Sequence, residues 1–398
     1  MKRTLLIAGN YPLPETTGEN IRTMNFVRFF KERGSVDIAC SQTLDGKEPG
    51  NPIFSNEYFL KKRDYPQHFT GRLAEILQGR PYPLREYSDD SINLLSSIIE
   101  ANDYDYIVIR YIVNAYYFYK LPVRQKPRII LDFDDLYSGN LYEILFNDKK
   151  SLYKKIKRNV NRKFLLRYEK KCLDLGLSIF CSDEDRRRTA GNRKYAFVVP
   201  NIYLNRTFDN YDFGNGFENR NTLLFVGTLT YSPNIEGLKW FINLVWPEFK
   251  RKFPDAKFIV VGHIGNSSGT EIKKCCQAGE DIELHTNVPD VKEYYKRCGA
   301  LVVPLFQGGG TRIKILEAAL ASRPVLSTPV GAEGLDLLDG RDILLFKNTE
   351  EFSVKFKQIL EEKRYNSLVR SAKEYVLKNY SLQKFDEAMK KVLDKNLD

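Results

Sequence analysis

The chain has 398 residues, of which 42% are hydrophobic, and a formal net charge of +11. This length predicts two domains, and no apolar run approaches the roughly 20 residues that a membrane-spanning helix needs. The apolar start at residues 5–8 is too short for a signal peptide, and the six cysteines show neither a disulfide framework nor metal-ligand spacing. We therefore expect reduced thiols and a cytoplasmic protein.

Strand-like and helix-like segments alternate along the first half of the chain. Residues 2–8 and 36–40 are predicted strands, separated by a polar loop over 10–18 and a helix that ends near residue 33. This βαβ opening predicts a parallel, doubly wound sheet, in which ligands bind beyond the carboxyl ends of the strands. The other predicted elements of this half are helices at 69–79 and 88–101 and strands at 106–109, 128–131, 177–181 and 196–199. Ser182 is the predicted N-cap of a short helix that follows.

An acidic group follows the strand at 128–131. It contains Asp132, Asp134 and Asp135. One interpretation is an acidic turn that caps a helix before Leu136. The other is a functional site, and the position at a strand end favours it.

One basic segment accounts for nearly all of the excess positive charge. Residues 149–171 carry eleven Lys or Arg and one Glu, a balance of 11 − 1 = +10. Apolar residues recur there every four positions, which predicts a helix with one apolar stripe: Leu152, Ile156, Val160, Phe164 and Tyr168. The helix either packs within a domain with a solvated basic face, or is attracted to an anionic membrane surface or an anionic substrate. No nucleic-acid-binding motif accompanies the charge, so nucleic acid is not an expected partner.

A second alternating series begins at residue 221, after an aperiodic stretch at 200–220 that predicts an interdomain linker. Ser232 is the predicted N-cap and Pro233 the first residue of a helix that runs to about residue 252. Another helix is expected from Pro289 to about residue 298. The predicted strands of this half are 222–227, 257–262, 282–284, 301–303, 324–327 and 342–346, with a glycine-punctuated loop at 330–335.

The stretch at 300–321, ALVVPLFQGGGTRIKILEAALA, predicts a phosphate-binding turn. A strand is followed by Gly308, Gly309 and Gly310, and a helix is expected from Thr311. Glycine lets the backbone approach a ligand, and the first N–H groups of a helix bind anions. Arg312 and Lys314 add positive charge, and the carboxylate of Glu317 can accept hydrogen bonds from a vicinal diol such as a ribose. The sequence therefore predicts a nucleotide diphosphate site.

The second half of the chain resembles glycosyltransferase family 4, whose members have the GT-B fold. The matching pieces keep the family order: FVGTLTYSPNIEGLKWF at 225–241, FPDAKFIVVG at 253–262, VPDVKEYYKRCGALVVPL at 288–305, GGGTRIKILEAALASRPVLSTPVGAEGL at 308–335 and YSL at 380–382. The first half resembles the family more loosely, in PLPETTGENIR at 12–22, DFDDL at 132–136 and VPN at 199–201.

The resemblance implies an α/β protein with two Rossmann-like domains that face a central cleft. The expected parts are an acceptor-binding domain at 1–202, a linker at 203–220, a nucleotide-sugar-binding domain at 221–380, and a last helix at 381–398 that crosses back to the first domain. The implied activity is a retaining transfer of a sugar without metal or other cofactor, from a UDP-sugar rather than a GDP-sugar. The implied acceptor is a saccharide or a lipid-linked saccharide at the inner membrane face, in the synthesis of a surface polysaccharide.

The family's functional positions carry over to single residues. Glu317 matches the carboxylate that binds the donor ribose, and Gly309, Gly310 and Thr311 match the pyrophosphate cradle. Val288 matches the position at the nucleobase. The remaining positions expected at the donor are Gly18, Gly227, Thr228, Gly308, Arg312 and Lys314.

The chain departs from the family pattern at three places. Gly309 stands where many members have the first Glu of an E-x7-E arrangement, and Thr228 and the YSPN segment stand where many have an Arg and a Lys. Arg312 and Lys314 can supply that charge. Asp134 and Asp135 occupy the place of a His-Asp pair, so the usual His contact to the sugar is missing. We expect Asp134, Asp135 and Arg312 to take part in catalysis, the two carboxylates by orienting the acceptor or the sugar.

Three alternatives remain open. Asp132 and Asp134 form a D-x-D sequence, which binds Mn²⁺ or Mg²⁺ in transferases of the GT-A fold. A nucleotide-sugar epimerase on the GT-B scaffold would turn over the donor without an acceptor. A non-catalytic protein that binds a nucleotide sugar or a partner would fit the lost Glu and the lost Arg/Lys pair.

Overall fold

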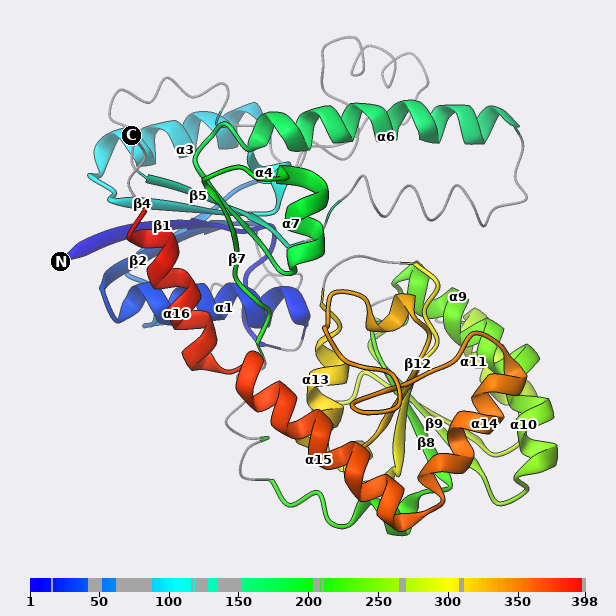
Figure 1. Ribbon diagram of the computed structural model, residues 1–398. Coiled ribbons are helices and arrows are strands. Elements are labelled where there is room, and N and C mark those ends of the chain that lie inside the picture. The colour runs from blue at the N-terminus through cyan, green and yellow to red at the C-terminus, as the bar shows by residue number, and fades with distance from the viewer. Residues whose placement is uncertain are drawn as a thin grey trace. The chain divides into compact units, whose positions relative to one another are not determined.

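The computed structural model describes residues 1–15, 17–41, 52–61, 88–115, 118, 128–134, 136, 152–202, 208, 211–264, 270–307 and 311–395, with only the backbone described at 152–161 and 270. The chain divides into two compact units (Figure 1), one formed by Met1–Pro200 with Phe385–Asp398 and the other by Asn201–Lys384. None of the helices in these described ranges is both long and apolar enough to cross a membrane.

The first unit contains a parallel sheet of seven described strands in the order β3-β2-β1-β4-β5-β6-β7. The strands are β1 (Lys2–Ile7), β2 (Gly34–Cys40), β3 (Glu57–Phe59), β4 (Tyr106–Arg110), β5 (Arg128–Phe133), β6 (Leu177–Phe180) and β7 (Ala196–Val198). The helices are α1 (Gly18–Lys31), α3 (Asp89–Ala101), α4 (Ile112–Ala115), α6 (Leu152–Cys172) and α7 (Asp183–Ala190). The order reverses at β1, so the strand-end loops of β1 and β4 diverge there, which is where such sheets hold ligands.

Short polar side chains begin three described helices of the first unit, α1, α3 and α7. The hydroxyl of Thr17 accepts a hydrogen bond from the Asn20 amide at 3.2 Å, so Gly18 is the first residue of α1. Ser88 and Ser182 cap α3 and α7 in the same way. The predicted N-cap at Ser182 and the helix at 88–101 are confirmed, whereas the predicted helix at 69–79 lies outside the described residues.

The second unit contains a parallel sheet of six described strands in the order β10-β9-β8-β11-β12-β13. The strands are β8 (Thr222–Val226), β9 (Lys257–Gly262), β10 (Ile282–Thr286), β11 (Ala300–Val303), β12 (Val325–Ser327) and β13 (Leu344–Leu345). The helices are α9 (Ser232–Trp240), η3 (Phe241–Val245), α10 (Trp246–Lys252), α11 (Thr270–Ala278), α12 (Lys292–Arg297), α13 (Ile313–Leu320), α14 (Thr349–Ile359) and α15 (Glu362–Asn379), with short 3₁₀ turns η2 (Gly216–Asn219) and η4 (Val330–Ala332).

Three predicted helix starts of this unit are wrong. Tyr231 is the N-cap of α9, and the Ser232 hydroxyl bonds Glu236 at 2.7 Å instead of capping. Helix α13 starts at Ile313 rather than Thr311, because Arg312 has ψ 90° and is not helical. Helix α12 starts at Lys292, three residues after Pro289. The predicted helix from 232 to 252 is confirmed, with a π-helical turn at 241–245 directly before α10. The second residue of α10 is Pro247, which has no N–H to donate to the preceding turn.

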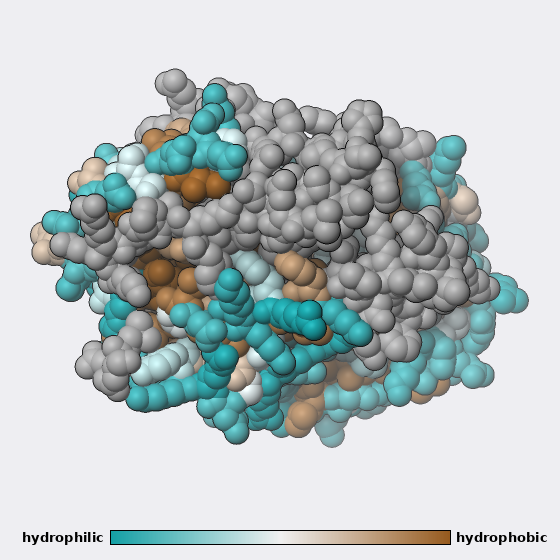
Figure 2. All heavy atoms as spheres, turned by 90° about the horizontal axis from the view of Figure 1, so that it is seen from above, coloured by the Kyte–Doolittle hydropathy of each residue, from teal (hydrophilic) through white to brown (hydrophobic). Residues whose placement is uncertain are grey.

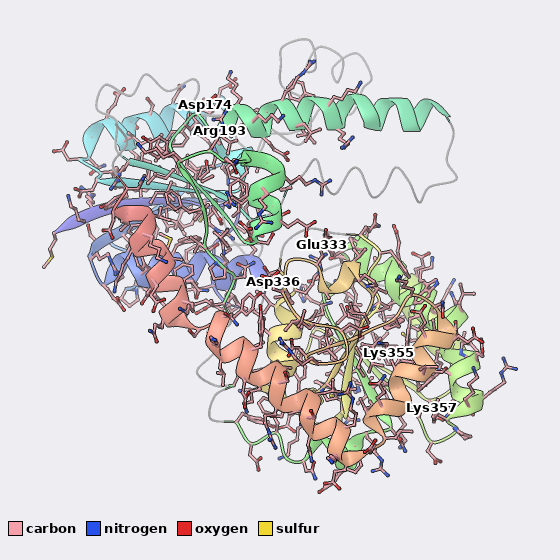
Figure 3. The ribbon with its side chains drawn as sticks, viewed as in Figure 1. Asp174, Arg193, Glu333, Asp336, Lys355 and Lys357 are labelled. Atoms are coloured by element: carbon pink, nitrogen blue, oxygen red, sulfur yellow. The ribbon has the colours of Figure 1, made fainter. Side chains whose placement is uncertain are left out.

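An apolar core fills each unit. In the second unit aromatic rings from helix and strand pack together, with Phe241 5.1 Å from Phe258 and 5.0 Å from Phe352 between ring centroids. Ion pairs join outer elements to each other, for example Lys355 on α14 with Asp339 in the loop before β13 at 2.8 Å (Lys355 is labelled in Figure 3). Figure 2 shows hydrophilic and hydrophobic residues interspersed over the described part of one face, as is normal for a protein surface.

The last helix, α16 (Leu382–Leu393), packs on the first unit. Phe385 is fully buried, with its ring centroid 5.3 Å from Phe26 and 6.3 Å from Phe29 of α1. Arg128 at the start of β5 donates to the Leu393 carbonyl at 2.5 Å. The chain therefore returns to its first unit, as the family resemblance predicts.

Candidate functional site

The candidate site of the second unit lies where β8 and β11 end and α9 and α13 begin. The carboxyl ends of parallel strands meet at one edge of a sheet, so the loops after β8 and β11 are brought together there. Asn234 of α9 donates to the Thr228 carbonyl at 2.8 Å, and Lys314 of α13 donates to the Asn234 side-chain oxygen at 3.2 Å. A Cβ atom on Gly227 would lie 2.8 Å from the Lys314 Nζ atom. The structure thus joins Gly227, Thr228 and Lys314, three residues predicted from sequence, through Asn234.

The Lys314 ammonium group contacts an uncharged amide oxygen and an aromatic ring. Its Nζ atom lies 4.4 Å from the centroid of the Phe225 ring, an attractive contact for a cation. Burial, and after it the charge of Arg312, lower the pKa of Lys314 to about 7. Glu317 opposes this shift. A lysine with such surroundings is stabilised in its charged form by an anion that binds next to it.

Glu317 lies one helical turn after Lys314 on α13. Its Oε2 atom accepts a hydrogen bond from the Tyr295 hydroxyl at 2.8 Å. Burial raises the pKa of Glu317, and the hydrogen bond from Tyr295 opposes that rise. The helix thus presents a cation near its start and a hydrogen-bonded carboxyl group one turn later.

The start of α13 can bind an anion. Arg312 precedes the helix without a side-chain cap bond, and it is 9% exposed. The N–H groups of the first turn and the positive end of the helix dipole lie beside Arg312 and Lys314. Together these groups suit the negative charge of a diphosphate, while Glu317 suits hydroxyl donors.

The other predicted residues of this unit lie at the same strand ends or outside the described part. Thr311 precedes Arg312 and is 9% exposed, and Val288 lies two residues after β10 and is partly exposed. Gly308, Gly309 and Gly310 lie outside the described residues, so the glycine cradle stays a prediction. The role of Val288 at the base is equally a prediction.

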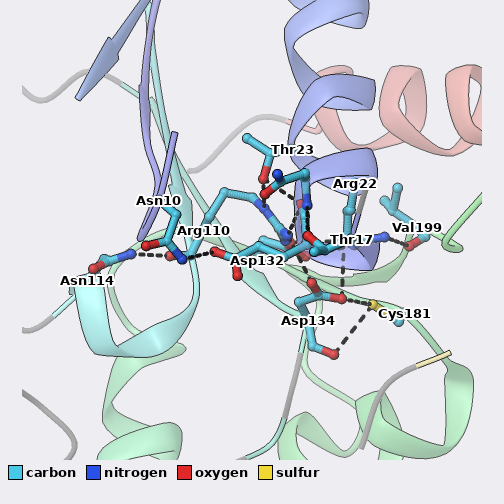
Figure 4. A network of polar contacts seen from close by, with 12 residues as sticks. Asn10, Thr17, Arg22, Thr23, Arg110, Asn114, Asp132, Asp134, Cys181 and Val199 are labelled. Atoms are coloured by element: carbon cyan, nitrogen blue, oxygen red, sulfur yellow. Dashed lines mark hydrogen bonds and ion pairs between the residues drawn. The ribbon is translucent and has the colours of Figure 1, made fainter. Parts of the chain in front are cut away.

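A buried ionic network occupies the ends of β4, β5 and β6 in the first unit (Figure 4). Arg22 of α1 contacts both carboxylate oxygens of Asp132, at 2.7 and 3.0 Å, and donates to the Val199 carbonyl at 3.0 Å. Arg110 contacts Asp132 and donates to Asp134 at 2.9 Å. Two arginines and two aspartates therefore neutralise each other in the interior, which is the condition for burying charge.

Asp134, one of the predicted catalytic residues, is buried, with 7% of its surface exposed. Burial opposes its ionisation, but the charges of Arg110 and Arg22 outweigh burial and hold the pKa of the carboxyl well below its usual range. Burial raises the pKa of the Cys181 thiol well above its ordinary value, so the thiol keeps its proton and donates to Asp134 at 3.0 Å. Asp134 is ionised at neutral pH and accepts hydrogen bonds rather than protons.

This geometry corrects two interpretations of the acidic group. Asp132 and Asp134 do not cap a helix, since their carboxylates bind Arg22 and Arg110. The same ion pairs occupy the D-x-D carboxylates with cations of the protein, which argues against a metal between them. Asp135 lies outside the described residues, and its predicted role, like that of Asp134 in catalysis, stays a prediction.

Sequence reasoning missed the partners that hold the predicted residues. Arg110 directly follows the predicted strand at 106–109. Arg22 lies on a helix 110 residues before Asp132. Tyr295 and Asn234 stand 22 and 80 residues from their partners on α13. No periodicity or spacing links positions so far apart.

The basic helix is confirmed as α6, and its described half packs by the predicted stripe. Phe164 packs against the core, and Tyr168 is 7% exposed and donates to the Ile112 carbonyl at 3.1 Å. Leu152, Ile156 and Val160 lie where side chains are not described. Lys163, Arg167, Lys170 and Lys171 are exposed on the same helix.

Known proteins resemble this chain in sequence and in fold. Residues 220–362 match the model of the family described as glycosyl transferases group 1. A Klebsiella pneumoniae protein described as "Uncharacterized 44.6 kDa protein in cps region" is 26% identical over 257 residues. That alignment covers 63% of this chain and 63% of the relative. The second unit therefore carries a group 1 glycosyltransferase domain, as the sequence predicts.

Solved structures with similar folds cover nearly the whole chain. Sucrose-phosphate synthase from Thermosynechococcus elongatus is 15% identical with a TM-score of 0.72, over 99% of this chain and 98% of that one. Anabaena HepE in complex with UDP-glucose is 11% identical with a TM-score of 0.64, over 99% and 100%. An E. coli structure described as trehalose-6-phosphate bound with UDP-2-fluoro glucose is 13% identical with a TM-score of 0.69, over 100% of both chains.

These likenesses establish the GT-B fold. Two parallel sheets covered by helices, with the last helix on the first unit, are the architecture that the sequence resemblance predicts. The alternative of a GT-A fold is therefore wrong.

Removing one carboxylate from the buried network tests its electrostatic role. Asp134→Asn should lower the free energy of unfolding at pH 7 by about 3 kcal/mol, because Arg110 loses a buried partner. The folded-state pKa of Asp134 lies below its ordinary 3.8, so its stabilisation is present above about pH 4 and is lost as pH falls towards the folded-state pKa. The difference between wild type and variant should therefore shrink at pH 3, as measured by urea unfolding.

The matched control is Asp174→Asn. Asp174 pairs with Arg193 at 2.5 Å (both labelled in Figure 3), but the two side chains are 65% and 48% exposed. Its effect should be small at every pH, because solvent screens exposed ion pairs. Equal effects of the two substitutions would contradict the role given to Asp134.

Proposed function

We propose that this protein is a retaining glycosyltransferase that works without metal and moves a sugar from a nucleotide diphosphate donor, a UDP-sugar rather than a GDP-sugar, to a saccharide or lipid-linked acceptor. The observation that carries the proposal is the start of α13, where Arg312, Lys314 and Glu317 follow one another within the group 1 glycosyltransferase domain. UDP-glucose and a UDP-sugar analogue in similarly folded structures support UDP as the nucleotide. A relative in a cps region supports a setting in polysaccharide synthesis.

In the proposed reaction, positively charged groups of the site stabilise the negative charge that develops on the leaving phosphate. As the bond between the sugar and the diphosphate breaks, negative charge develops on the leaving phosphate. Arg312, Lys314 and the first N–H groups of α13 stabilise that charge in the role that a divalent cation has in other transferases. The acceptor oxygen forms its new bond on the face that the diphosphate leaves, and the leaving phosphate takes the acceptor proton. Asp134 is proposed to orient the acceptor or the sugar as a hydrogen-bond acceptor.

Substitution of Glu317 tests donor binding. Calorimetric titration with UDP-, GDP-, ADP- and dTDP-sugars, with EDTA present, should give binding of one nucleotide class. Glu317→Ala should weaken that binding by roughly tenfold or more, because hydrogen bonds between hydroxyls and a charged group are lost. Glu350→Ala, an exposed carboxylate at the start of α14, is the control and should bind as wild type does.

The outcomes separate the competing functions. An unchanged affinity of Glu317→Ala would remove Glu317 from the donor site. Binding followed by conversion of the donor without an acceptor would indicate an epimerase. Binding without hydrolysis, conversion or transfer to any acceptor would indicate a non-catalytic protein.

The pH dependence of donor binding tests Lys314. Its pKa of about 7 rises when a diphosphate binds, so affinity should be highest below pH 7 and fall by up to tenfold per pH unit above it. A nucleotide sugar is the suitable ligand, since its diphosphate does not titrate near neutral pH. Lys314→Met should abolish the slope between pH 6.5 and 8.5. If the affinity of Lys314→Met still changes with pH over this range, the pH dependence belongs to another titrating group.

We propose further that α6 holds the protein at an anionic membrane surface, where a lipid-linked acceptor would lie. The exposed Lys163, Arg167 and Lys170 support this, since each basic residue near such a surface contributes about 1 kcal/mol. Changing these three to Glu should abolish sedimentation with phosphatidylglycerol vesicles at low salt. Changing the exposed Lys363, Arg370 and Lys378 of α15 to Glu alters the net charge equally and should leave sedimentation intact. Sedimentation retained by the α6 variant would contradict the proposal.

A further inference from the structure

Tyr295 makes the only hydrogen bond to the Glu317 carboxylate among the described residues. The side chain of Tyr295 comes from α12 and is fully buried. Its hydroxyl oxygen lies 2.8 Å from Glu317 Oε2 and 3.2 Å from the Lys314 carbonyl oxygen. A phenol has one hydroxyl proton to donate. The carboxylate oxygen is closer than the carbonyl oxygen and is negatively charged, so it forms the stronger hydrogen bond. The proton of Tyr295 is therefore directed at Glu317.

Tyr295 is itself held rigidly. Its carbonyl accepts from the Nε atom of Arg323 at 2.9 Å, and its ring packs edge-on against Phe208 with 5.6 Å between centroids. Arg323 is fully buried and also donates to the Phe213 carbonyl at 2.6 Å and the Ala321 carbonyl at 2.8 Å. Phe208, the Phe213 carbonyl, α12 and the end of α13 are thus held together around Tyr295 and Arg323.

A fixed tyrosine restricts where the Glu317 carboxylate can point. An unanchored glutamate has several rotamers, and a long side chain loses up to about 2 kcal/mol of rotamer entropy when it is ordered. The Tyr295 bond holds one carboxylate oxygen in place before any ligand arrives. Glu317 remains partly exposed, so the rest of its hydrogen-bonding capacity faces outward.

We propose that Tyr295 is a positioning residue that makes the site select ribonucleoside diphosphate donors over 2′-deoxyribonucleoside ones. The inference rests on the proposed function, because it takes Glu317 as the group that binds the donor ribose. A carboxylate held in one orientation pairs best with two adjacent hydroxyls placed opposite it. When the 2′-hydroxyl is missing, a fixed carboxylate cannot turn toward another donor. The binding free energy of the lost hydrogen bond is then not recovered elsewhere. A carboxylate that is free to turn pairs with the remaining hydroxyl or with water, and discriminates less.

The test compares the dissociation constants of UDP and 2′-deoxy-UDP for three proteins. Wild type should prefer UDP by about tenfold or more, the size expected for a hydrogen bond to a charged group. Tyr295→Phe fills the same space without the hydroxyl and should reduce that preference to roughly threefold or less. Tyr365→Phe is the matched control, since Tyr365 is buried in the same unit and its hydroxyl bonds the Gly299 carbonyl at 2.8 Å, away from Glu317. It should keep the wild-type ratio even where it lowers the melting temperature.

Each result decides between a positioning and a merely structural role. A Tyr295→Phe variant that keeps the wild-type ratio, with or without a lower melting temperature, would overturn the inference. Equal binding of UDP and 2′-deoxy-UDP by wild type would overturn it while the proposed function stands. If the wild-type protein binds GDP instead of UDP, the same comparison is made with GDP and 2′-deoxy-GDP. Binding of neither nucleotide would overturn the proposed function itself.

Discussion

Buried charge is the constraint on which both halves of this protein depend. In the first unit Arg22 and Arg110 lie opposite Asp132 and Asp134 at the carboxyl ends of the central strands. Each ion would be costly alone in the interior, and the four together are neutral. The network joins α1, β4 and β5 at the carboxyl ends of these strands.

The balance of charged side chains differs in the second unit. Two basic residues, Arg312 and Lys314, and one acidic residue, Glu317, follow one another at the start of α13. Burial, and after it the charge of Arg312, lower the pKa of Lys314 more than Glu317 raises it. A bound diphosphate would add negative charge beside Lys314 and favour its charged form. The charges of the first unit's network are therefore balanced within the protein, whereas the cluster on α13 suits the diphosphate of the proposed donor.

The sequence predicted the described strands of both sheets except the short edge strand β3, because each of the others has a local signature. Apolar runs mark β1, β9 and β11, and helix periodicity marks α3. Local rules failed at helix starts of the second unit. Ser232 bonds Glu236 instead of capping α9, and the chain enters α13 only after Arg312. The acidic residues after β5 were noticed, but their meaning depended on arginines elsewhere in the chain.

What the sequence by itself determined is the alternation of strands and helices, the family resemblance, and the residues on α13 that carry positive and negative charge. These depend on neighbours within a few positions, or on motifs in a fixed order. Only the tertiary structure decided that Asn234 holds Lys314, that Tyr295 holds Glu317, and that Arg22 and Arg110 neutralise Asp132 and Asp134. The reason is physical: a hydrogen bond or ion pair acts over a few ångströms, and only folding brings residues from distant positions within that range.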